Sequence, residues 1–235
     1  MSIIRFHFSM VHGMLDLKYY LLVLFEGKIY YAMRSIAVLA SGNGTNFQAI
    51  IEAVKAGVIG GGNVSILLSD RKDAYAIHRA EDNGIPFRVI PYTKGDPEIF
   101  YGKMRDAIRS ANPDLIVLAG FNRILPDRVL SGYRAINIHP SLLPCFGGRG
   151  FYGLKVHEAV LASGAKFSGC TVHFVTGEVD GGPIILQRIV EVRDEDTPES
   201  LAERIHLEEH IAIVEAIRIA LDGNYTISGN RVLKS

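Results

Sequence analysis

The sequence predicts an α/β fold: an open, mainly parallel, twisted sheet with helices on both faces. One observation is a set of continuous apolar runs, of which residues 115–120 form the most apolar; such runs are typical of strands buried in a parallel sheet. A second observation is that segments with helical periodicity separate these runs. Strands that alternate with helices form right-handed βαβ units, and these units build one open sheet.

The predicted elements follow one another regularly from residue 36. We expect strands at residues 36–40, 64–68, 87–90, 115–120, 133–139, 169–175 and 184–187. We expect helices at residues 47–54, 74–83, 97–110, 154–163 and 198–221, the last with Thr197 as N-cap and Gly223 as its stop, and a C-terminal hairpin at 225–232. The strand at 169–175 alternates between polar and apolar residues, which predicts that only one of its faces is buried.

The composition is that of an ordinary globular protein. Its 25 Lys and Arg balance its 25 Asp and Glu, and this neutrality argues against nucleic acid as a partner, which would require a basic surface. The two cysteines, Cys145 and Cys170, are too few for a disulfide framework and predict a reducing, cytoplasmic location. The apolar run at residues 19–25 is too short to span a bilayer, so we expect no membrane partner.

Residues 1–33 do not share the pattern of the rest of the chain. They carry His, Phe and Tyr with no clear period, and their apolar run lacks the small-residue cleavage site of a signal peptide. We therefore expect residues 1–33 to be an N-terminal extension outside the main domain at 34–235, produced by a mis-set start or by cloning. An appended hairpin or helix is the alternative.

A glycine-rich turn at residues 41–46 joins the first predicted strand of the main domain to its helix. Such a turn lets backbone N–H groups approach an anion at the positive end of the helix. Phe47 stands where a dinucleotide-binding fingerprint needs its third glycine, and no Lys-Ser/Thr pair follows as in a P-loop. The turn therefore suits one phosphate; the alternative is a tight turn in which an asparagine only caps the helix.

Asn137 and His139 lie two residues apart at the end of a predicted strand. Residues two apart in a strand project from the same face, and the carboxyl ends of strands are where an open α/β sheet binds its ligands. Pro140 and Pro144 then end the strand. The alternative interpretation is a polar edge strand with a hydrogen-bonded core histidine.

Three further segments follow predicted strands. The loop at residues 121–126 has an apolar rim and one guanidinium, which suits a flat heterocycle with a polar edge, although a helix could also start there. The glycines within residues 147–150 predict a mobile flap. Asp180 precedes Gly181 and Gly182, where a functional carboxylate and a simple turn initiator are both compatible with the sequence.

The C-terminal predicted helix contains His206, Glu209 and His210 in an H-x-x-E-H zinc pattern. A helical pair supplies two metal ligands on one face, and a third must come from elsewhere. No acidic helix follows to supply it, so we expect no metal.

Five separated motifs closely resemble the phosphoribosylglycinamide formyltransferases, a family of folate-dependent enzymes. They are residues 41–46, 119–125, 137–144, 172–176 and 180–183, in the family's order within about residues 34–230. The resemblance implies a catalytic domain that carries a formyl group from the co-substrate 10-formyltetrahydrofolate to the amine of glycinamide ribonucleotide, in de novo purine biosynthesis. It also implies small-molecule partners and a monomer or homodimer.

The same resemblance implies the roles of individual residues. It assigns catalysis to Asn137, His139 and Asp180. Binding of the nucleotide substrate is assigned to Asn43, Gly44, Thr45, Asn46, Glu209 and His206, the last standing where a glutamine is frequent. Folate binding is assigned to Phe121, Asn122, Arg123, Ile124, Leu125, Val175 and Val179.

This chemistry agrees with the residue types. Formyl transfer to an amine passes through a tetrahedral oxyanion, for which Asn137 and His139 are suitable hydrogen-bond donors, and Asp180 can relay a proton. The alternative enzyme is formyltetrahydrofolate deformylase, which hands the same formyl group to water. Its usual motifs differ from residues 139–144 and 180–183, and residues 1–33 are too few for its regulatory domain.

Overall fold

The computed structural model describes residues 22–25, 28–31 and 33–234 of the chain. Eleven strands are present in these residues: β1 (Leu22–Phe25), β2 (Lys28–Tyr31), β3 (Arg34–Leu39), β4 (Gly62–Ser69), β5 (Phe87–Val89), β6 (Leu115–Leu118), β7 (Ala135–His139), β8 (Phe167–Phe174), β9 (Ile184–Glu191), β10 (Tyr225–Ser228) and β11 (Arg231–Lys234). The helices are α1 (Thr45–Lys55), α2 (Tyr75–Asp82), α3 (Pro97–Ala111), α4 (Asp127–Leu130), α5 (Leu154–Ser163) and α6 (Pro198–Asp222). The predicted elements of the main domain are therefore confirmed.

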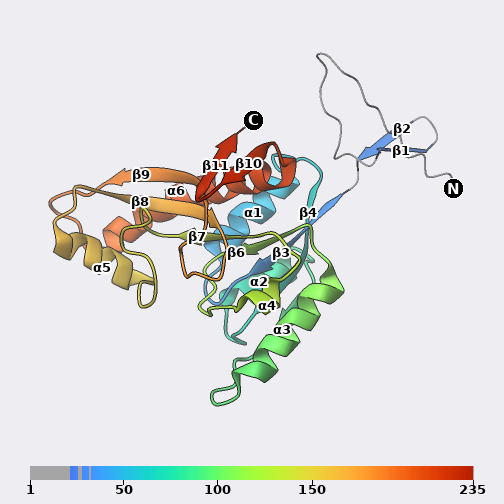
Figure 1. Cartoon of the computed structure of the whole chain (residues 1–235), viewed down its shortest axis with the longest axis horizontal. Coiled ribbons are helices and arrows are strands. Elements are labelled where there is room, and N and C mark those ends of the chain that lie inside the picture. Colours follow the sequence, from blue (N-terminus) through green and yellow to red (C-terminus); the bar gives the residue numbers. More distant parts are fainter. Residues whose placement is uncertain (1–21, 26–27, 32, 235) are drawn as a thin grey trace.

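Nine of the strands form one open sheet in the order β10-β11-β9-β8-β7-β6-β3-β4-β5 (Figure 1). The block from β5 to β7 is parallel throughout, as the alternation of strands and helices predicts. Beyond it, β7 pairs antiparallel with β8, and β8 pairs antiparallel with β9. The predicted fold class, a mainly parallel α/β sheet, is confirmed.

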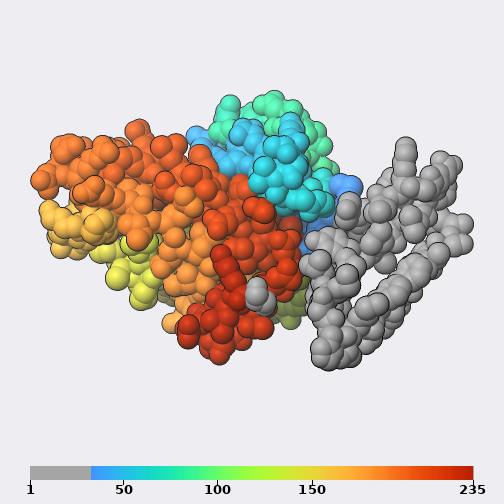
Figure 2. All heavy atoms as spheres, turned by 90° about the horizontal axis from the view of Figure 1, so that it is seen from above, coloured from blue at the N-terminus to red at the C-terminus, as the bar shows by residue number. Residues whose placement is uncertain are grey.

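Helices cover both faces of this sheet, as predicted. Residues of α1, α2, α5 and α6 pack with one face in a large hydrophobic cluster, and those of α3 and α4 pack with the other face in a smaller one. Figure 1 shows α3 and α4 on the opposite side of the sheet from α1 and α6. In the space-filling view of Figure 2, the cyan surface of α1 adjoins the orange and red surface of the C-terminal segments, in line with the contact between α1 and α6.

The long helix α6 begins and ends at the predicted residues because the residues that cap it are its immediate neighbours in the sequence. The Thr197 side chain accepts a hydrogen bond from the Ser200 backbone, and the Ser200 side chain accepts one from the Thr197 backbone. Gly223 ends the helix with a φ of 71°, a left-handed conformation that glycine adopts without strain. The apolar face between these caps, which includes Ile205, Ile213 and Ile217, is fully buried.

One prediction about burial is wrong. Strand β8 is buried along its whole length from Ser168 to Phe174, although its sequence alternates like that of a half-buried strand. Its apolar face, with Cys170 and Val172, packs in the larger hydrophobic cluster. Its polar face is buried too: Thr171 accepts from the Leu143 N–H in the loop after β7, and His173 contacts Asn137 of the neighbouring strand β7. Polar residues on that strand therefore indicate a buried network rather than solvent.

The described residues before Arg34 contribute no strand to the nine-stranded sheet. Strands β1 and β2 pair antiparallel with each other in a two-stranded sheet of their own. That pairing corresponds to the alternative of an appended hairpin, while most of residues 1–33 lie outside the described part of the chain. The assignment of this segment as an extension outside the main domain stays a prediction.

Within the residues that the structure describes, none of the helices combines the length and the apolar character that a membrane-spanning helix needs.

Candidate active site

Strand β7 positions the first two predicted catalytic side chains. Ile136 and Ile138 are buried in the main hydrophobic cluster, so the intervening Asn137 and the terminal His139 project from the other face of the strand. His139 is itself buried, with 4% of its surface exposed. The structure therefore places the Asn137 and His139 side chains together at the carboxyl end of a parallel strand, as predicted.

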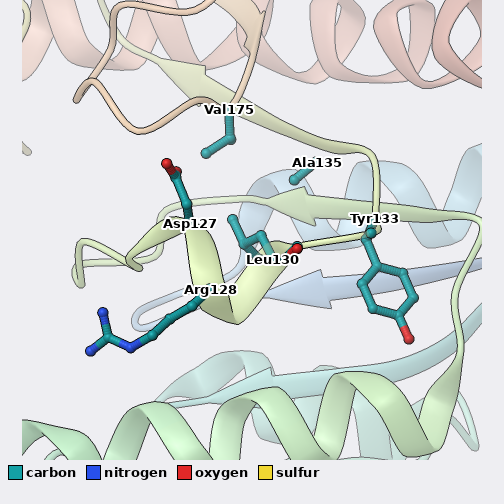
Figure 3. Close-up of a pocket in the computed structure, with 8 residues that line it drawn as sticks. Asp127, Arg128, Leu130, Tyr133, Ala135 and Val175 are labelled. Carbon is teal, nitrogen blue, oxygen red and sulfur yellow. The ribbon is translucent and has the colours of Figure 1, made fainter.

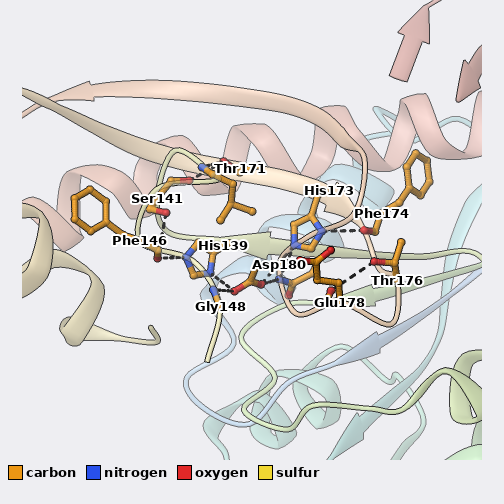
Figure 4. Close-up of polar contacts among 12 residues, drawn as sticks. His139, Ser141, Phe146, Gly148, Thr171, His173, Phe174, Thr176, Glu178 and Asp180 are labelled. Atoms are coloured by element: carbon orange, nitrogen blue, oxygen red, sulfur yellow. Dashed lines mark hydrogen bonds and ion pairs between the residues drawn. The ribbon is translucent and has the colours of Figure 1, made fainter. Parts of the chain in front are cut away.

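The third predicted side chain, Asp180, comes from the turn between β8 and β9 and meets Asn137 and His139; Figure 4 shows Asp180 beside His139. The Asn137 amide Nδ2 donates to Asp180 Oδ1 over 3.4 Å, and Nδ1 of His139 lies 3.6 Å from Asp180 Oδ2. The backbone N–H of Gly148 donates to the same Oδ2 over 2.9 Å. Residues more than forty positions apart in the sequence thus form one partly buried polar cluster.

His173 is a member of this cluster that the sequence-based assignment missed. In the antiparallel pairing of β7 and β8 it lies directly opposite Asn137, and its Nε2 lies 3.2 Å from the Asn137 Nδ2 atom. Its Nδ1 donates to the Phe174 carbonyl oxygen over 2.9 Å, and its Nε2 also lies 3.6 Å from Asp180 Oδ1. The spacing of Thr171 and His173 on one face of the strand was the available signal, but the strand register was needed to interpret it.

The electrostatics of the cluster favour a charged Asp180 beside a neutral His139. Burial acts to raise the pKa of Asp180, but the hydrogen bond with His173, the electrostatic interaction with the His139 imidazole and the Gly148 N–H outweigh it and hold the pKa below its ordinary value. Burial lowers the pKa of His139, against the opposing effects of Asp180 and the Phe146 carbonyl. A carboxylate that stays ionised next to an uncharged imidazole can accept a proton at neutral pH.

The glycine-rich segment after β7 closes over these side chains. The Phe146 carbonyl oxygen lies 2.8 Å from His139 Nε2, which therefore donates to it, and Gly148 holds Asp180 as described above. Gly147 approaches so closely that an added Cβ would lie 2.4 Å from the Leu143 side chain. The segment is held against the cluster by these contacts, and its mobility stays a prediction.

The turn at residues 42–46 lies at the N-terminus of α1, where backbone N–H groups have no partner within the helix. Gly44 occupies the N-cap position with a φ of 73°, and no side chain caps the helix. The alternative interpretation of this turn as an asparagine cap is therefore wrong. A Cβ on Gly44 would lie 2.7 Å from the Ala76 Cβ, so this position requires glycine both for its backbone and for its packing.

Two of the predicted substrate-binding residues are joined across the fold. The Asn46 side chain in α1 donates from Nδ2 to Oε2 of Glu209 in α6 over 3.1 Å, and both residues are buried. Burial raises the pKa of Glu209 to about 7, although the hydrogen bond from Asn46 acts to lower it. His206, one helical turn before Glu209, is half-exposed, and its Nε2 lies 3.9 Å from Glu209 Oε2.

The predicted folate-binding residues fall into two groups. Phe121, Leu125 and Val175 pack in the smaller hydrophobic cluster and form an apolar patch beside β7. The guanidinium of Arg123 donates from Nε to the buried Asp70 over 2.7 Å and lies over the ring of Tyr92. The remaining three residues lie outside this apolar patch. The Asn122 N–H donates to the Ser41 hydroxyl, the Ile124 side chain is exposed, and Val179 is partly buried.

A cavity of about 280 Å³ opens next to this apolar patch (Figure 3). Of the predicted folate contacts, only Val175 lines it; the remaining wall comes from Asp127, Arg128, Leu130, Ser131, Gly132, Tyr133 and Ala135. Ala135 begins β7, two residues before Asn137, so the cavity lies on the same strand as the polar cluster. These wall residues were missed because their sequence has no recognisable motif and becomes a wall only when β7 and the segment after β8 meet.

No group of three or more His, Cys, Asp or Glu side chains within the described residues is arranged to hold a metal ion. In the zinc-like pattern of α6, Oε2 of Glu209 accepts a hydrogen bond from Asn46 and lies 3.9 Å from His206 Nε2. The expectation of a metal-free site stays a prediction.

The fold and the site together define the class of protein. The chain belongs to the formyl transferase family, whose model matches residues 34–217.

Within this family the chain is similar to phosphoribosylglycinamide formyltransferases, and the resemblance read from its motifs is confirmed. It is 39% identical over 199 residues to that enzyme of Escherichia coli (strain K12), with 83% of this chain and 91% of the relative covered. It is 42% identical over 188 residues to the chloroplastic enzyme of Arabidopsis thaliana, covering 78% of this chain. The chain spans 64% of the length of that plant relative.

The solved structures agree. The crystal structure of glycinamide ribonucleotide transformylase 1 from Symbiobacterium toebii matches with a TM-score of 0.80 and 40% sequence identity. The match covers 88% of this chain and 97% of that one.

Proposed function

We propose that this protein transfers the formyl group of 10-formyltetrahydrofolate to the amine of glycinamide ribonucleotide, a step of de novo purine biosynthesis. The observation that carries the proposal is the convergence of Asn137, His139 and Asp180 in one partly buried cluster at the carboxyl end of β7. Membership of the formyl transferase family and similarity to phosphoribosylglycinamide formyltransferases support it.

The two substrates would bind on either side of the cluster. The nucleotide phosphate binds to the N–H groups of the 43–46 turn, and Glu209, which is tied to that turn through Asn46, accepts hydrogen bonds from the ribose hydroxyls. Formyl folate binds against the apolar patch of Phe121, Leu125 and Val175, next to the cavity of Figure 3. The reacting groups then meet between the two, beside β7.

The transfer needs no covalent intermediate with the enzyme. The substrate amine attacks the formyl carbon, a new C–N bond forms, and the carbonyl oxygen becomes an oxyanion that Asn137 and His139 stabilise as hydrogen-bond donors. Collapse of this intermediate breaks the bond to the folate nitrogen. The proton lost by the amine passes by way of Asp180, which is ionised at neutral pH, to the departing nitrogen.

His139 must be released before it can act in this way. Its Nε2–H is engaged by the Phe146 carbonyl, so the segment around residues 146–150 has to move aside when the formyl group enters. The glycines of this segment permit such a movement. We therefore include a moving flap in the proposed mechanism.

An assay that follows the absorbance of formyl folate, with and without glycinamide ribonucleotide, tests the proposal. We expect turnover only when the nucleotide is present, and we expect it to persist with a chelator because no step uses a metal. Equal turnover without the nucleotide would identify a deformylase, in which water replaces the amine. No turnover under either condition would reject both activities.

The remaining expectations belong to the same proposal. The partners are the two small-molecule substrates, and the protein acts as a monomer or homodimer. A cytoplasmic location fits the two free cysteines, Cys145 and Cys170. The plant relative named above is chloroplastic, so imaging of a tagged full chain is the relevant test of location.

A further inference from the structure

Helix α2 packs against the glycine-rich turn and hydrogen-bonds to it. The backbone N–H of Ala76 donates to the Gly42 carbonyl over 3.1 Å. The Arg79 guanidinium donates twice to Asn43, from Nε to the backbone carbonyl over 2.9 Å and from Nη2 to the side-chain Oδ1 over 2.8 Å. A third donor, Nη1, reaches Gln48 Oε1 in α1 over 3.4 Å.

These contacts orient the two peptide groups of the turn. The peptide bonds on either side of Asn43 are trans, and in a trans peptide the C=O and the N–H point in opposite directions. With the carbonyls of Gly42 and Asn43 directed at α2, the N–H groups of Asn43 and Gly44 are directed away from it. Across the described part of the chain, neither N–H has a hydrogen-bond acceptor, so both are available to a ligand.

The charge of Arg79 is also uncompensated. No carboxylate among the described residues lies within ion-pair distance of its guanidinium, in contrast to Arg71, which pairs with Asp73. Its partners are the neutral Asn43 and Gln48, and the ring of Tyr75 lies 5.0 Å from its Cζ atom. A positive charge beside two free N–H groups favours a phosphate dianion over a neutral ligand.

We propose that Arg79 is a positioning residue for the phosphate of the nucleotide substrate: by fixing the Asn43 peptide, it turns the N–H groups of Asn43 and Gly44 toward the phosphate. This inference rests on the proposed function, because it specifies how the predicted nucleotide site is built. It adds a residue from α2 to a site that the sequence motifs place only on the β3–α1 turn and α6.

Kinetics and direct binding of variants test the inference. Arg79→Met removes both the planar guanidinium and its charge, whereas Arg79→Lys keeps a positive charge without the planar group that donates from two nitrogens. We expect Arg79→Met to raise the KM for glycinamide ribonucleotide by at least about tenfold, which is the effect of losing one charged hydrogen bond. The Kd for ribose 5-phosphate, measured by calorimetry, should rise by the same factor. The KM for formyl folate and kcat should stay within about twofold.

The lysine variant separates positioning from simple attraction. Compared with Arg79→Met, we expect Arg79→Lys to recover less than half of the lost nucleotide affinity, measured as the logarithm of Kd or KM. Full recovery would show that a positive charge alone is sufficient and would overturn the positioning role. Equal increases in both KM values would also overturn it, because they would indicate general damage. Arg109→Met, at an exposed arginine in the last turn of α3 on the other face of the sheet, is the matched control and should change none of these constants.

The two proposals can fail separately. Wild-type protein that binds ribose 5-phosphate but transfers no formyl group would reject the proposed function while the Arg79 binding data still test the inference. Normal formyl transfer with a neutral Arg79→Met variant would reject the inference alone.

Discussion

Asp180 combines an unusual backbone with several donors to one carboxylate. Its φ of 55° places it in the left-handed region, which non-glycine residues rarely adopt and in which Asp and Asn are the best tolerated. The carboxylate receives the Asn137 amide and the Gly148 N–H, and it faces His139 and His173. The residue type is therefore compatible both with a turn and with acid–base chemistry, and only a substitution separates the two.

Asp180→Asn is that substitution, because asparagine keeps the size and tolerates the backbone while losing the charge. We expect kcat to fall at least about 100-fold, the usual contribution of an acid–base group, with a melting temperature within a few degrees of wild type. Asp73→Asn, at an exposed carboxylate paired with Arg71, is the control and should leave both quantities unchanged. A folded Asp180→Asn enzyme with a near wild-type rate would leave only the turn-forming role.

Glu209 should make stability depend on pH. Its pKa is about 7 in the folded protein against an ordinary value of 4.5, so the folded state holds a proton that the unfolded state has released between these values. The contribution of Glu209 to stability is then greatest below pH 4.5 and is lost as the pH rises through 7. The cause is burial of the carboxyl beside a single donor, Asn46.

Glu209→Gln removes the titration but keeps an acceptor for Asn46. We expect the variant and the wild type to melt at similar temperatures near pH 5, and the variant to melt higher near pH 8, where the wild type must bury a charge. Its KM for the nucleotide should rise because the ribose contact weakens. Thermal unfolding at both pH values checks this, and a temperature difference that does not change with pH would contradict the pKa assigned to Glu209.

At the scale of elements, the loop after β7 is attached to β8 by one hydroxyl. Oγ1 of Thr171 donates to the Ser141 carbonyl over 2.7 Å and accepts from the Leu143 N–H over 3.0 Å and from the Gln187 side chain over 2.9 Å. Thr171 and Ser141 are fully buried and Leu143 is buried too, so the Leu143 N–H would lack an acceptor without this hydroxyl. The network fixes the loop that carries the segment over His139.

Thr171→Val conserves the shape of this side chain and removes the hydroxyl. We expect a loss of about 1–3 kcal/mol in the free energy of unfolding, because the Leu143 N–H is left buried without its acceptor. Urea unfolding measures the loss. Thr226→Val on the exposed strand β10 is the matched control and should change stability by less than about 0.5 kcal/mol. Similar effects at both positions would show that the network contributes little.

At the scale of the whole molecule, the nine-stranded sheet begins at Arg34 among the described residues. The site residues come from β3 onward, and the family model also begins at residue 34. The candidate site residues therefore all lie within residues 34–235.

Deletion of residues 1–32 should leave kcat, both KM values and the melting temperature nearly unchanged. The physical reason is that the large sheet and the polar cluster draw on later residues. Size-exclusion chromatography and thermal unfolding of the shortened chain provide the measurement. Loss of soluble protein would show instead that the segment packs against the main domain.

The sequence by itself determined the elements and several of their ends. Helix α5 lies at the predicted residues 154–163, and α6 starts after Thr197 and stops at Gly223, because periodicity, caps and turn residues act over a few positions. The motifs at residues 41–46 and 137–144 also indicated the family, since several short signals coincide in order. These features are local, and local sequence is sufficient to specify them.

Only the tertiary structure decided which side chains meet. The register of β7 and β8 sets His173 opposite Asn137, and the packing of α2 on the glycine-rich turn brings Arg79 to Asn43. Helix α6 and the loop after β7 pack against β8, and both of its faces are buried, which its alternating sequence does not predict. Such contacts join positions far apart in the chain, and no short-range pattern records them, because they depend on strand order and helix placement over the whole sheet.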